Sequence, residues 1–400
     1  MVKRKLYLDD IRGFYHDKSL IKVIYGLRRS GKSVILEQIM NELKEKGIAD
    51  KYIIYINFEL LDTNIKNAKD LDSYIKNITI EEKTYYVFLD EVQKVEDFEK
   101  GVNSLRVRNK CSIFITGSNS RMTASELSTD LTGRYVKFKI NPLSFKEIVE
   151  LTETKKDDYE KLLYDIFEWG SLPQRFLYKS DTDKRNYISD VYDAIFLKDI
   201  VERLGIKDIT AFNKLLQYVL EIEGREFSAT NVLEFLGKEK NEISSQTLYN
   251  YLDALCSTFI LNKVYRYDIN GKSILKTLNK YYTSDLGIKK IKNNNKDLNY
   301  SICLENLVYN ELIIKGYEVF IGKTKKGEVD FVATKDKEFK YIQVCFHLSN
   351  DETKTREFGA YEAIKDNYDK YVISLDKENF SRNGIKHINA IDFFMNDDFK

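Results

Sequence analysis

Short apolar runs alternate with amphipathic stretches through the first third of the chain. Five runs rich in β-branched and aromatic residues occur at 21–25, 52–59, 85–91, 112–116 and 134–140. Each is nearly continuous in its apolar character, as a strand buried on both faces of a parallel sheet must be. The segments between them are compatible with helices, for instance 34–47, which ends at a glycine suited to close a helix. This alternation predicts an α/β fold with a parallel sheet covered by helices on both faces.

Beyond Asn141-Pro142 the pattern changes to helices. Residues 143–206 indicate a helical region with an internal turn at 169–173. Further helices are expected at 212–222, 228–237 and 244–259, and then a β-hairpin at 264–285 around Asn270-Gly271, a strong turn signal. Three helices followed by a hairpin favour a winged helix, which we assign to residues 207–288.

The last hundred residues show a second α/β pattern. One helix is expected at 301–315, and strands are expected at 317–322, 328–334, 341–346 and 370–376. A stretch rich in Asn and Lys at 289–299 has the composition of a loop and separates this unit from the preceding one. The sequence therefore predicts four parts, at 1–142, 143–206, 207–288 and 300–400.

The segment that follows the first predicted strand, GLRRSGKS at 26–33, fits the P-loop pattern G-x-x-x-x-G-K-[ST] at every defined position. Its glycines let backbone N–H groups curl around phosphate oxygens, and the next helix adds its N-terminal dipole. Lys32 is expected to reach the β- and γ-phosphates, and Ser33 to offer its hydroxyl to magnesium. Arg28 and Arg29 either grip phosphate or pair with acidic residues at a domain interface. We predict a site for ATP and Mg²⁺ built from Gly26, Leu27, Arg28, Arg29, Ser30, Gly31, Lys32, Ser33 and Val34.

Two adjacent carboxylates are expected to complete this site. Asp90 and Glu91 end the third predicted strand, and ligands bind at the C-terminal edge of open parallel sheets. Asp90 is expected to hold the magnesium shell, and Glu91 to activate the attacking water as a general base. The fourth strand leads to Ser118 and Asn119, one of which is expected beside the γ-phosphate, with Ser118 preferred. Arg134 either stabilises charge on the transferred phosphate, within the chain or across to a neighbouring subunit, or caps a turn at the surface.

These motifs, together with FLDEVQ (88–93), ITGSNS (115–120), LTGRY (131–135) and PLSFKE (142–147), resemble the AAA+-type ATPases of archaea and bacteria in the STAND-related clade. The segments WGSLP (169–173), FLKDIVERLGI (196–206), SSQTLYNYLDAL (244–255) and YYTSDLG (281–287) resemble the C-terminal domain of unknown function that such ATPases carry. The resemblance covers essentially the whole chain and implies a five-stranded P-loop core, a helical region and a winged helix. In related ATPases these parts transmit the nucleotide state to DNA or to a protein partner. A homo-oligomer is also compatible with this resemblance.

The C-terminal unit resembles the restriction-endonuclease layout but lacks part of its chemistry. Glu305 on a helix and Asp330 on a strand match the acidic positions, whereas Gln343 and Cys345 stand where a second acid and a lysine are needed. That chemistry requires carboxylates for a divalent metal and a lysine to position the water. We therefore expect the fold without cleavage. An active nuclease gated by ATP, and an unrelated α/β unit with solvated acids, are the alternatives.

The predicted wing is the basic part of the second half of the chain. Four of its residues are the expected phosphate contacts, because the helix at 244–256 carries no basic residue. They are Arg266, Lys272, Lys276 and Lys280. Weak, sequence-independent DNA binding is one prediction for this surface. The alternatives are that this surface docks a protein partner or that it is simply a charged face exposed to solvent.

Composition limits the remaining choices. Lys and Arg number 64 against 63 Asp and Glu, and the net charge of +1 excludes a chain-wide field for nucleic acid. The four cysteines are scattered singly, which argues against a zinc site and favours thiols in a reducing cytosol. No apolar run approaches the length of a membrane span or of a signal-peptide core. We expect a soluble, cytoplasmic protein of two or three domains that hydrolyses ATP, the alternative being a regulator that only senses it.

Overall fold

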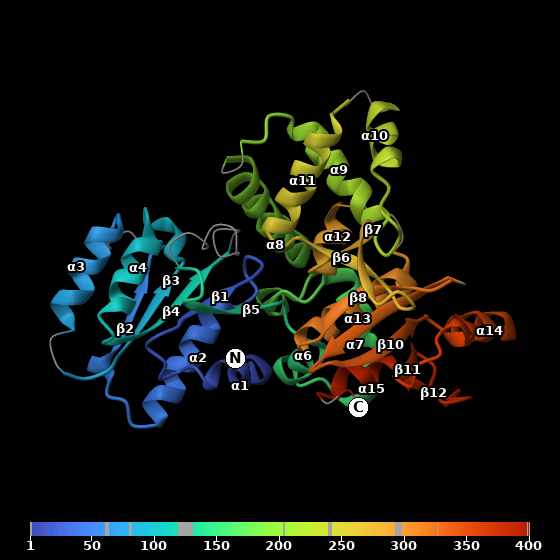
Figure 1. Cartoon of the computed structure of the whole chain (residues 1–400), viewed down its shortest axis with the longest axis horizontal. Helices are drawn as coiled ribbons and strands as arrows, with labels where there is room; N and C mark the ends of the chain where they lie inside the picture. The colour runs from blue at the N-terminus through green and yellow to red at the C-terminus, as the bar shows by residue number, and fades with distance from the viewer. Residues whose placement is uncertain are drawn as a thin grey trace. The chain divides into compact units, whose positions relative to one another are not determined.

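The computed structural model describes residues 2–60, 64–79, 82–118, 131–202, 205–238, 242–292, 298–325, 327–397 and 399. The chain divides into two compact units, residues 1–142 and 143–400. Each unit is built around its own sheet (Figure 1). Among the described residues, no helix combines the length and the apolar character needed to cross a bilayer.

The first unit contains a sheet of five parallel strands in the order β2-β3-β4-β1-β5. The strands are β1 (Ile21–Tyr25), β2 (Ile53–Asn57), β3 (Tyr85–Asp90), β4 (Cys111–Gly117) and β5 (Tyr135–Lys139). The helices are α1 (Lys5–Arg12), α2 (Lys32–Glu45), α3 (Ala68–Ile78) and α4 (Phe98–Val107). Each strand coincides with one of the five apolar runs in the sequence, and their ends differ by at most a few residues. The predicted parallel α/β core is therefore confirmed.

Alternation along the strands assigns each side chain to one face of this sheet. On β3, Tyr86 and Phe88 belong to the core that α1 and α2 cover, whereas Val87 and Leu89 belong to the core that α3 and α4 cover. Because both faces are buried, the strand shows no polar alternation, and its first polar side chain is Asp90 at the C-terminal end. The layered packing therefore brings the polar chemistry to one edge of the sheet.

The second unit combines a helical part with a mixed sheet of seven strands in the order β12-β11-β10-β9-β8-β6-β7. Its helices are α6 (Phe145–Thr152), α7 (Tyr159–Trp169), α8 (Asp181–Ala194), α9 (Ile209–Glu221), α10 (Ala229–Lys238), α11 (Ser245–Ser257), α12 (Leu286–Lys292), α13 (Tyr300–Ile314), α14 (Asp351–Gly359) and α15 (Ala390–Met395). Its strands are β6 (Leu261–Asp268), β7 (Ser273–Thr283), β8 (Glu318–Lys323), β9 (Glu328–Lys335), β10 (Glu338–Val344), β11 (Asp369–Ser374) and β12 (Ile385–Asn389). A C-terminal α/β region follows the helices, as the sequence predicts.

The hairpin formed by β6 and β7 is part of this sheet. It is antiparallel, with its turn after Asp268, whose carboxylate accepts hydrogen bonds from the backbone N–H groups of Asn270 and Gly271. Strand β6 also pairs in parallel with β8, which places Arg266 opposite Ile321. The segments that the sequence assigns to separate parts, at 207–288 and 300–400, thus share one continuous sheet. The pairing of β6 with β8 covers one edge of the hairpin, whereas the sequence alone predicts a hairpin exposed to solvent.

Candidate nucleotide site

The P-loop connects β1 to α2. Gly26 has φ 147°, and a Cβ atom on it would lie 2.1 Å from the carbonyl oxygen of Ile140, so no larger residue fits there. Gly31 has φ 99° and precedes α2 without a side-chain cap on the helix. The amino group of Lys32 lies 3.1 Å from the carbonyl oxygen of Leu27 and 3.3 Å from that of Gly26. The loop therefore curls around the lysine at a helix N-terminus, an arrangement that suits a bound phosphate.

A buried arginine supports this loop from the N-terminal segment. Arg4 is only 1% exposed. Its guanidinium donates to the carbonyl oxygens of Ser30 at 3.0 Å, Asn141 at 2.9 Å and Pro142 at 3.3 Å. It also lies over the ring of Tyr7 at 4.8 Å. Arg4 thus joins the P-loop backbone to the segment that leaves β5.

The acidic pair stands at the C-terminal end of β3. Asp90 is 1% exposed, and hydroxyl groups hold both of its oxygens. Thr116 donates to Oδ1 at 2.5 Å, and Tyr55 donates to Oδ2 at 2.9 Å. The Thr116 hydroxyl also accepts a hydrogen bond from the backbone N–H of Glu91 at 2.9 Å. Since Thr116 pairs with Ile24 on β1, β4 connects the acidic pair laterally to the strand that feeds the P-loop.

Glu91 adopts φ 55°, a left-handed conformation that costs about 1–2 kcal/mol in a residue with a Cβ atom. Its side chain accepts hydrogen bonds at one oxygen, Oε2, from the amide of Gln93 and from the hydroxyl of Ser118 at 3.2 Å. Ser118 therefore lies beside the expected general base. Asn119, the other candidate for contact with the γ-phosphate, lies outside the described residues.

The two arginines inside the loop differ in environment. Arg28 forms a long ion pair of 3.8 Å with Glu59, which also lies 3.8 Å from the amino group of Lys94. Arg29 is exposed and has φ 65°. The sequence left open whether Arg28 contacts phosphate or pairs with an acidic residue at a domain interface. It pairs with an acidic residue, but that residue belongs to the first unit, like Arg28 itself.

Arg134 lies at the N-terminal end of the parallel strands, whereas the P-loop lies at their C-terminal end. It immediately precedes β5, and β5 runs parallel to β1 with Tyr135 opposite Ile21. Arg134 lies one residue before this pairing begins and Gly26 lies one residue after it ends, so six residue steps along the strands separate them, roughly 20 Å at about 3.3 Å per residue. This separation does not support action of Arg134 on a phosphate bound by its own chain. Action on a neighbouring subunit stays a prediction.

Sequence reasoning missed two residues of the site, Thr116 and Tyr55. Each lies near the C-terminal end of a predicted strand, where polar groups collect in a parallel sheet. Thr116 stands two residues before Ser118, so its position at the strand end could have suggested it. Tyr55 gave no signal, because an aromatic residue within an apolar strand is ordinary.

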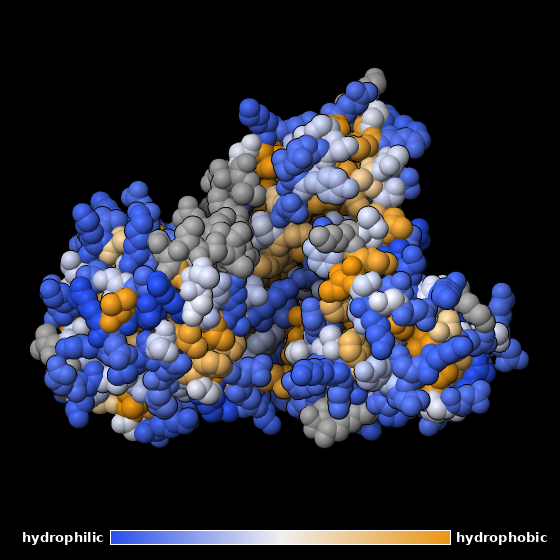
Figure 2. Space-filling model, viewed as in Figure 1, coloured by the Kyte–Doolittle hydropathy of each residue, from blue (hydrophilic) through white to orange (hydrophobic). Residues whose placement is uncertain are grey.

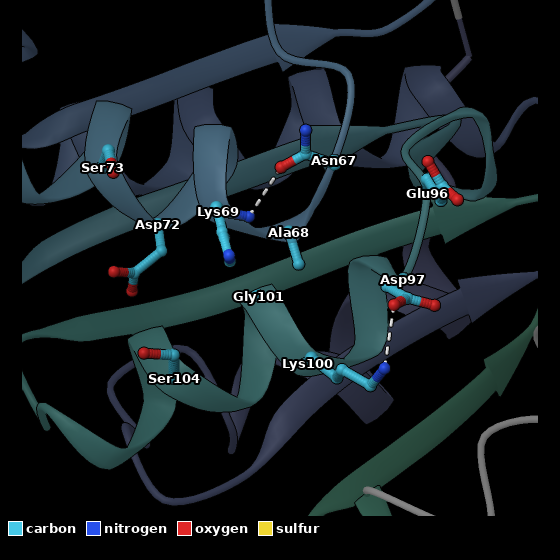
Figure 3. A pocket seen from close by; sticks show the side chains of 10 residues that line it. All are labelled: Asn67, Ala68, Lys69, Asp72, Ser73, Glu96, Asp97, Lys100, Gly101 and Ser104. Carbon is cyan, nitrogen blue, oxygen red and sulfur yellow. Dashed lines mark hydrogen bonds and ion pairs between the residues drawn. The ribbon is translucent and has the colours of Figure 1, made fainter.

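A separate cavity of about 790 Å³ lies between the N-terminal halves of α3 and α4 (Figure 3). Its lining is mostly polar or small and consists of Asn67, Ala68, Lys69, Asp72, Ser73, Glu96, Asp97, Lys100, Gly101 and Ser104. The surface around these helices is largely hydrophilic (Figure 2). Because α3 and α4 cover the face of the sheet opposite α2, this cavity is distinct from the P-loop site.

The nuclease-like residues of the second unit are held in contacts within the protein. The carboxylate of Asp330 accepts from the backbone N–H of Val344 at 2.8 Å, and the side-chain amide of Gln343 donates to Glu357 at 2.8 Å. Burial raises the pKa of Asp330 well above its usual range. Glu305 accepts from the hydroxyl of Tyr282 at 2.6 Å, and burial raises the pKa of this carboxyl as well.

The position where a catalytic lysine is needed, Cys345, also supplies no positive charge. Burial raises the pKa of the Cys345 thiol, so this residue carries no charge at neutral pH. In the described part of the chain, no three His, Cys, Asp or Glu side chains are arranged to hold a metal ion. The absence of cleavage therefore stays the prediction for this unit.

The expectation that four basic residues of the hairpin contact phosphate is wrong for two of them. Arg266 is 7% exposed and pairs with Glu226 at 2.9 Å. Lys280 is 4% exposed and pairs with Glu328, with Glu305 at 3.9 Å. The pairing of β6 with β8 and the packing of α13 account for this burial. Lys272 is exposed, and the side chain of Lys276 is outside the described part.

Comparison with known proteins agrees with this geometry. Residues 18–149 match the family model of an AAA domain, and residues 160–297 match that of a domain of unknown function (DUF8612). The chain is 36% identical over 401 residues to an uncharacterized protein of Haemophilus influenzae, covering 99% of each chain. It is 32% identical over 386 residues to the uncharacterized protein MJ1544 of Methanocaldococcus jannaschii, covering 90% of this chain and 83% of that one.

Among solved structures, AMPPCP-bound DnaA from Aquifex aeolicus matches 53% of this chain and 66% of its own, with 18% identity and a TM-score of 0.28. The AAA domain confirms the P-loop part of the family resemblance. The STAND-related clade and the nuclease-like character of the C-terminal segment stay predictions.

Proposed function

The chain belongs to the family of AAA-domain proteins that includes the Haemophilus influenzae and Methanocaldococcus jannaschii relatives, and we propose that it binds ATP with magnesium, hydrolyses it, and acts as a nucleotide-dependent switch. The observation that carries this proposal is the lateral contact made by Thr116. Its hydroxyl holds both the Asp90 carboxylate and the Glu91 backbone at the edge of the sheet where the P-loop begins.

Binding of the nucleotide is assigned to the loop. The backbone N–H groups from Gly26 to Ser33 and the N-terminus of α2 bind phosphate oxygens, and the ammonium of Lys32 neutralises their charge. Lys32 then exchanges its present contacts with two loop carbonyls for contacts with the phosphates. Arg29, exposed at the rim of the loop, supplies a further cation.

Magnesium prefers oxygen ligands, and the residues at this edge fit that preference. The Ser33 hydroxyl in the first turn of α2 and the Asp90 carboxylate would hold the ion and its waters. When bound, the ion neutralises charge that develops between the β- and γ-phosphates. Asp90 is suited to this role because two hydroxyl donors already fix its orientation.

Hydrolysis requires a base beside the γ-phosphate. Glu91 accepts the proton of the attacking water, and Ser118 orients the carboxylate by donating to Oε2. In the present arrangement the Gln93 amide donates to the same oxygen. Because both of these hydrogen bonds fall on Oε2, the other oxygen, Oε1, is the one assigned to the proton of the water.

Two substitutions test this proposal. Lys32→Ala is expected to abolish tight nucleotide binding, since Arg28 pairs with Glu59 and Arg29 lies at the exposed rim, so neither takes the place of the ammonium inside the loop. Glu91→Gln is expected to retain binding and to slow hydrolysis about a hundredfold or more, as loss of a positioned base does. Binding is measured with a fluorescent ATP analogue, and hydrolysis by phosphate release. Parental phosphate release from Glu91→Gln would contradict the assignment of the base.

The output of the switch is proposed to be a protein contact. Burial of Arg266 and Lys280 removes two of the four expected phosphate contacts from the hairpin. In contrast, α11 presents Tyr249, which is 48% exposed, beside the side chains of Gln246 and Asn250, which are hydrogen-bonded to each other at 2.9 Å. Phosphate release measured with and without DNA tests this choice, and stimulation by DNA would instead favour the nucleic-acid partner.

A further inference from the structure

The Asp90 carboxylate is held from both sides by neighbouring strands. Thr116 on β4 holds Oδ1, and Tyr55 on β2 holds Oδ2 at 2.9 Å. The Thr116 contact has a structural reason of its own, because the same hydroxyl also accepts from the Glu91 backbone. The Tyr55 hydroxyl, by contrast, makes its hydrogen bond to the one carboxylate that is expected to serve the metal.

The strand register explains how Tyr55 reaches this position. On β2, Tyr55 lies opposite Phe88, and Asn57 lies opposite Asp90. Because side chains two residues apart on a strand share a face, Tyr55, Phe88 and Asp90 lie on the same side of the sheet. That side is the one covered by α2, the helix that carries Lys32 and Ser33. The tyrosine hydroxyl therefore enters the nucleotide edge from the direction opposite the P-loop strand.

Packing alone does not account for this tyrosine. Its side chain is 43% exposed, so the residue contributes less to the core than its buried neighbours on β3. The phenol of a tyrosine ordinarily ionises at about pH 10, so the Tyr55 hydroxyl is a hydrogen-bond donor throughout the physiological range. A hydrogen bond to a charged acceptor is stronger than one between neutral groups, so this contact favours one orientation of the carboxylate.

We propose that Tyr55 is a positioning residue for the magnesium site, which rests on the ATP-binding function proposed above. Its hydroxyl fixes the plane of the Asp90 carboxylate. One lone pair of Oδ2 accepts from Tyr55 and one of Oδ1 accepts from Thr116, which leaves one acceptor site on each oxygen that would serve the metal shell. A carboxylate oxygen has two acceptor sites, so the tyrosine and a metal-bound water can be accommodated together. Partners of this kind, one step removed from the ion, typically change metal affinity by about 10–100-fold when they are removed.

The test compares Tyr55→Phe with Tyr74→Phe. Both changes delete only a hydroxyl, and Tyr74 is an exposed residue of α3, on the other face of the sheet. The affinity of each protein for a fluorescent ATP analogue is measured in EDTA and during a titration with Mg²⁺. For Tyr55→Phe we expect the metal-free affinity to stay at the parental value and the Mg²⁺ concentration for half-saturation to rise about tenfold. Tyr74→Phe is expected to match the parent in both measurements.

A double-variant cycle separates positioning from a general structural effect. If Tyr55 acts through the carboxylate, adding Tyr55→Phe to Asp90→Asn shifts the Mg²⁺ dependence no further than Asp90→Asn alone. Additive shifts, an unchanged Mg²⁺ dependence in Tyr55→Phe, or a lowered half-saturation concentration would each overturn the proposal. The last result would mean that the tyrosine competes with the ion. If the parent protein binds no nucleotide under either condition, the proposed function fails and this inference fails with it.

Discussion

Replacement of Arg4 by methionine is expected to destabilise the first unit selectively. Methionine has an unbranched apolar side chain similar in length to the aliphatic part of arginine, but it has no side-chain hydrogen-bond donor. Arg4 is almost completely buried, so water does not replace the lost donors freely. Three backbone carbonyls, those of Ser30, Asn141 and Pro142, then lose a charged donor. A buried polar group left without a partner costs about 1–3 kcal/mol. Because a carbonyl has a second lone pair and the Pro142 contact is long, we take the lower value for each, about 3 kcal/mol in total.

Hydrogen exchange of backbone amides measures this loss in each unit separately. Peptides of β1, α2 and β5 that exchange through opening of the whole unit should exchange about a hundredfold faster in Arg4→Met, since about 1.4 kcal/mol corresponds to a factor of ten. Peptides from residues 143–400 should keep their parental rates. Lys100→Met is the control. The Lys100 side chain is 63% exposed and pairs with Asp97, which is 59% exposed, and an exposed pair contributes about 0–1 kcal/mol.

Two results would refute this reasoning. Acceleration of less than about fivefold in the first unit would show that water satisfies the three carbonyls at little cost. Equal acceleration in both units would show that Arg4 does not act locally.

The remaining predictions concern both units. Mixing Arg134→Ala with Lys32→Ala protein should restore hydrolysis if Arg134 acts on the nucleotide of a neighbouring subunit, whereas full activity of Arg134→Ala alone would remove the role. The protein should leave linear and supercoiled DNA intact in the presence of Mg²⁺ or Mn²⁺ and ATP, and cleavage that disappears in Asp330→Ala would contradict this. Lys280→Met should cost about 3–5 kcal/mol near pH 8, because Glu305 and Glu328 lose their buried counter-ion. The raised pKa of Glu305 means that the folded state takes up a proton there as the pH falls, so this cost should be smaller at pH 5. Unfolding followed by the fluorescence of Trp169, the single tryptophan, checks the last prediction, and an equal cost at both pH values would contradict it.

The features of this protein that depend on local spacing were predictable from its amino-acid sequence. The P-loop pattern specifies a lysine, a hydroxyl and glycines within eight residues, and Gly26 and Gly31 indeed adopt positive φ values. Apolar runs bounded by turn signals located the strands of the first unit, because strands buried on both faces are mostly apolar. Asp90 and Glu91 were recognisable for the same reason, since they end such a run.

Which residues lie side by side depends on the order of the strands in the folded sheet. Thr116 and Tyr55 reach Asp90 because β4 and β2 flank β3, and the lateral order of strands leaves no local pattern in the sequence. Arg134 follows a plausible motif, but the direction of β5 puts it at the N-terminal end of the parallel strands. Arg266 and Lys280 have the sequence of a solvated basic hairpin. In the folded chain β6 pairs with β8 and Arg266 pairs with Glu226, whereas Lys280 on β7 is buried against Glu305 of α13 and Glu328 of β9. Charge is a property of a residue, whereas its exposure depends on what the rest of the chain packs against it.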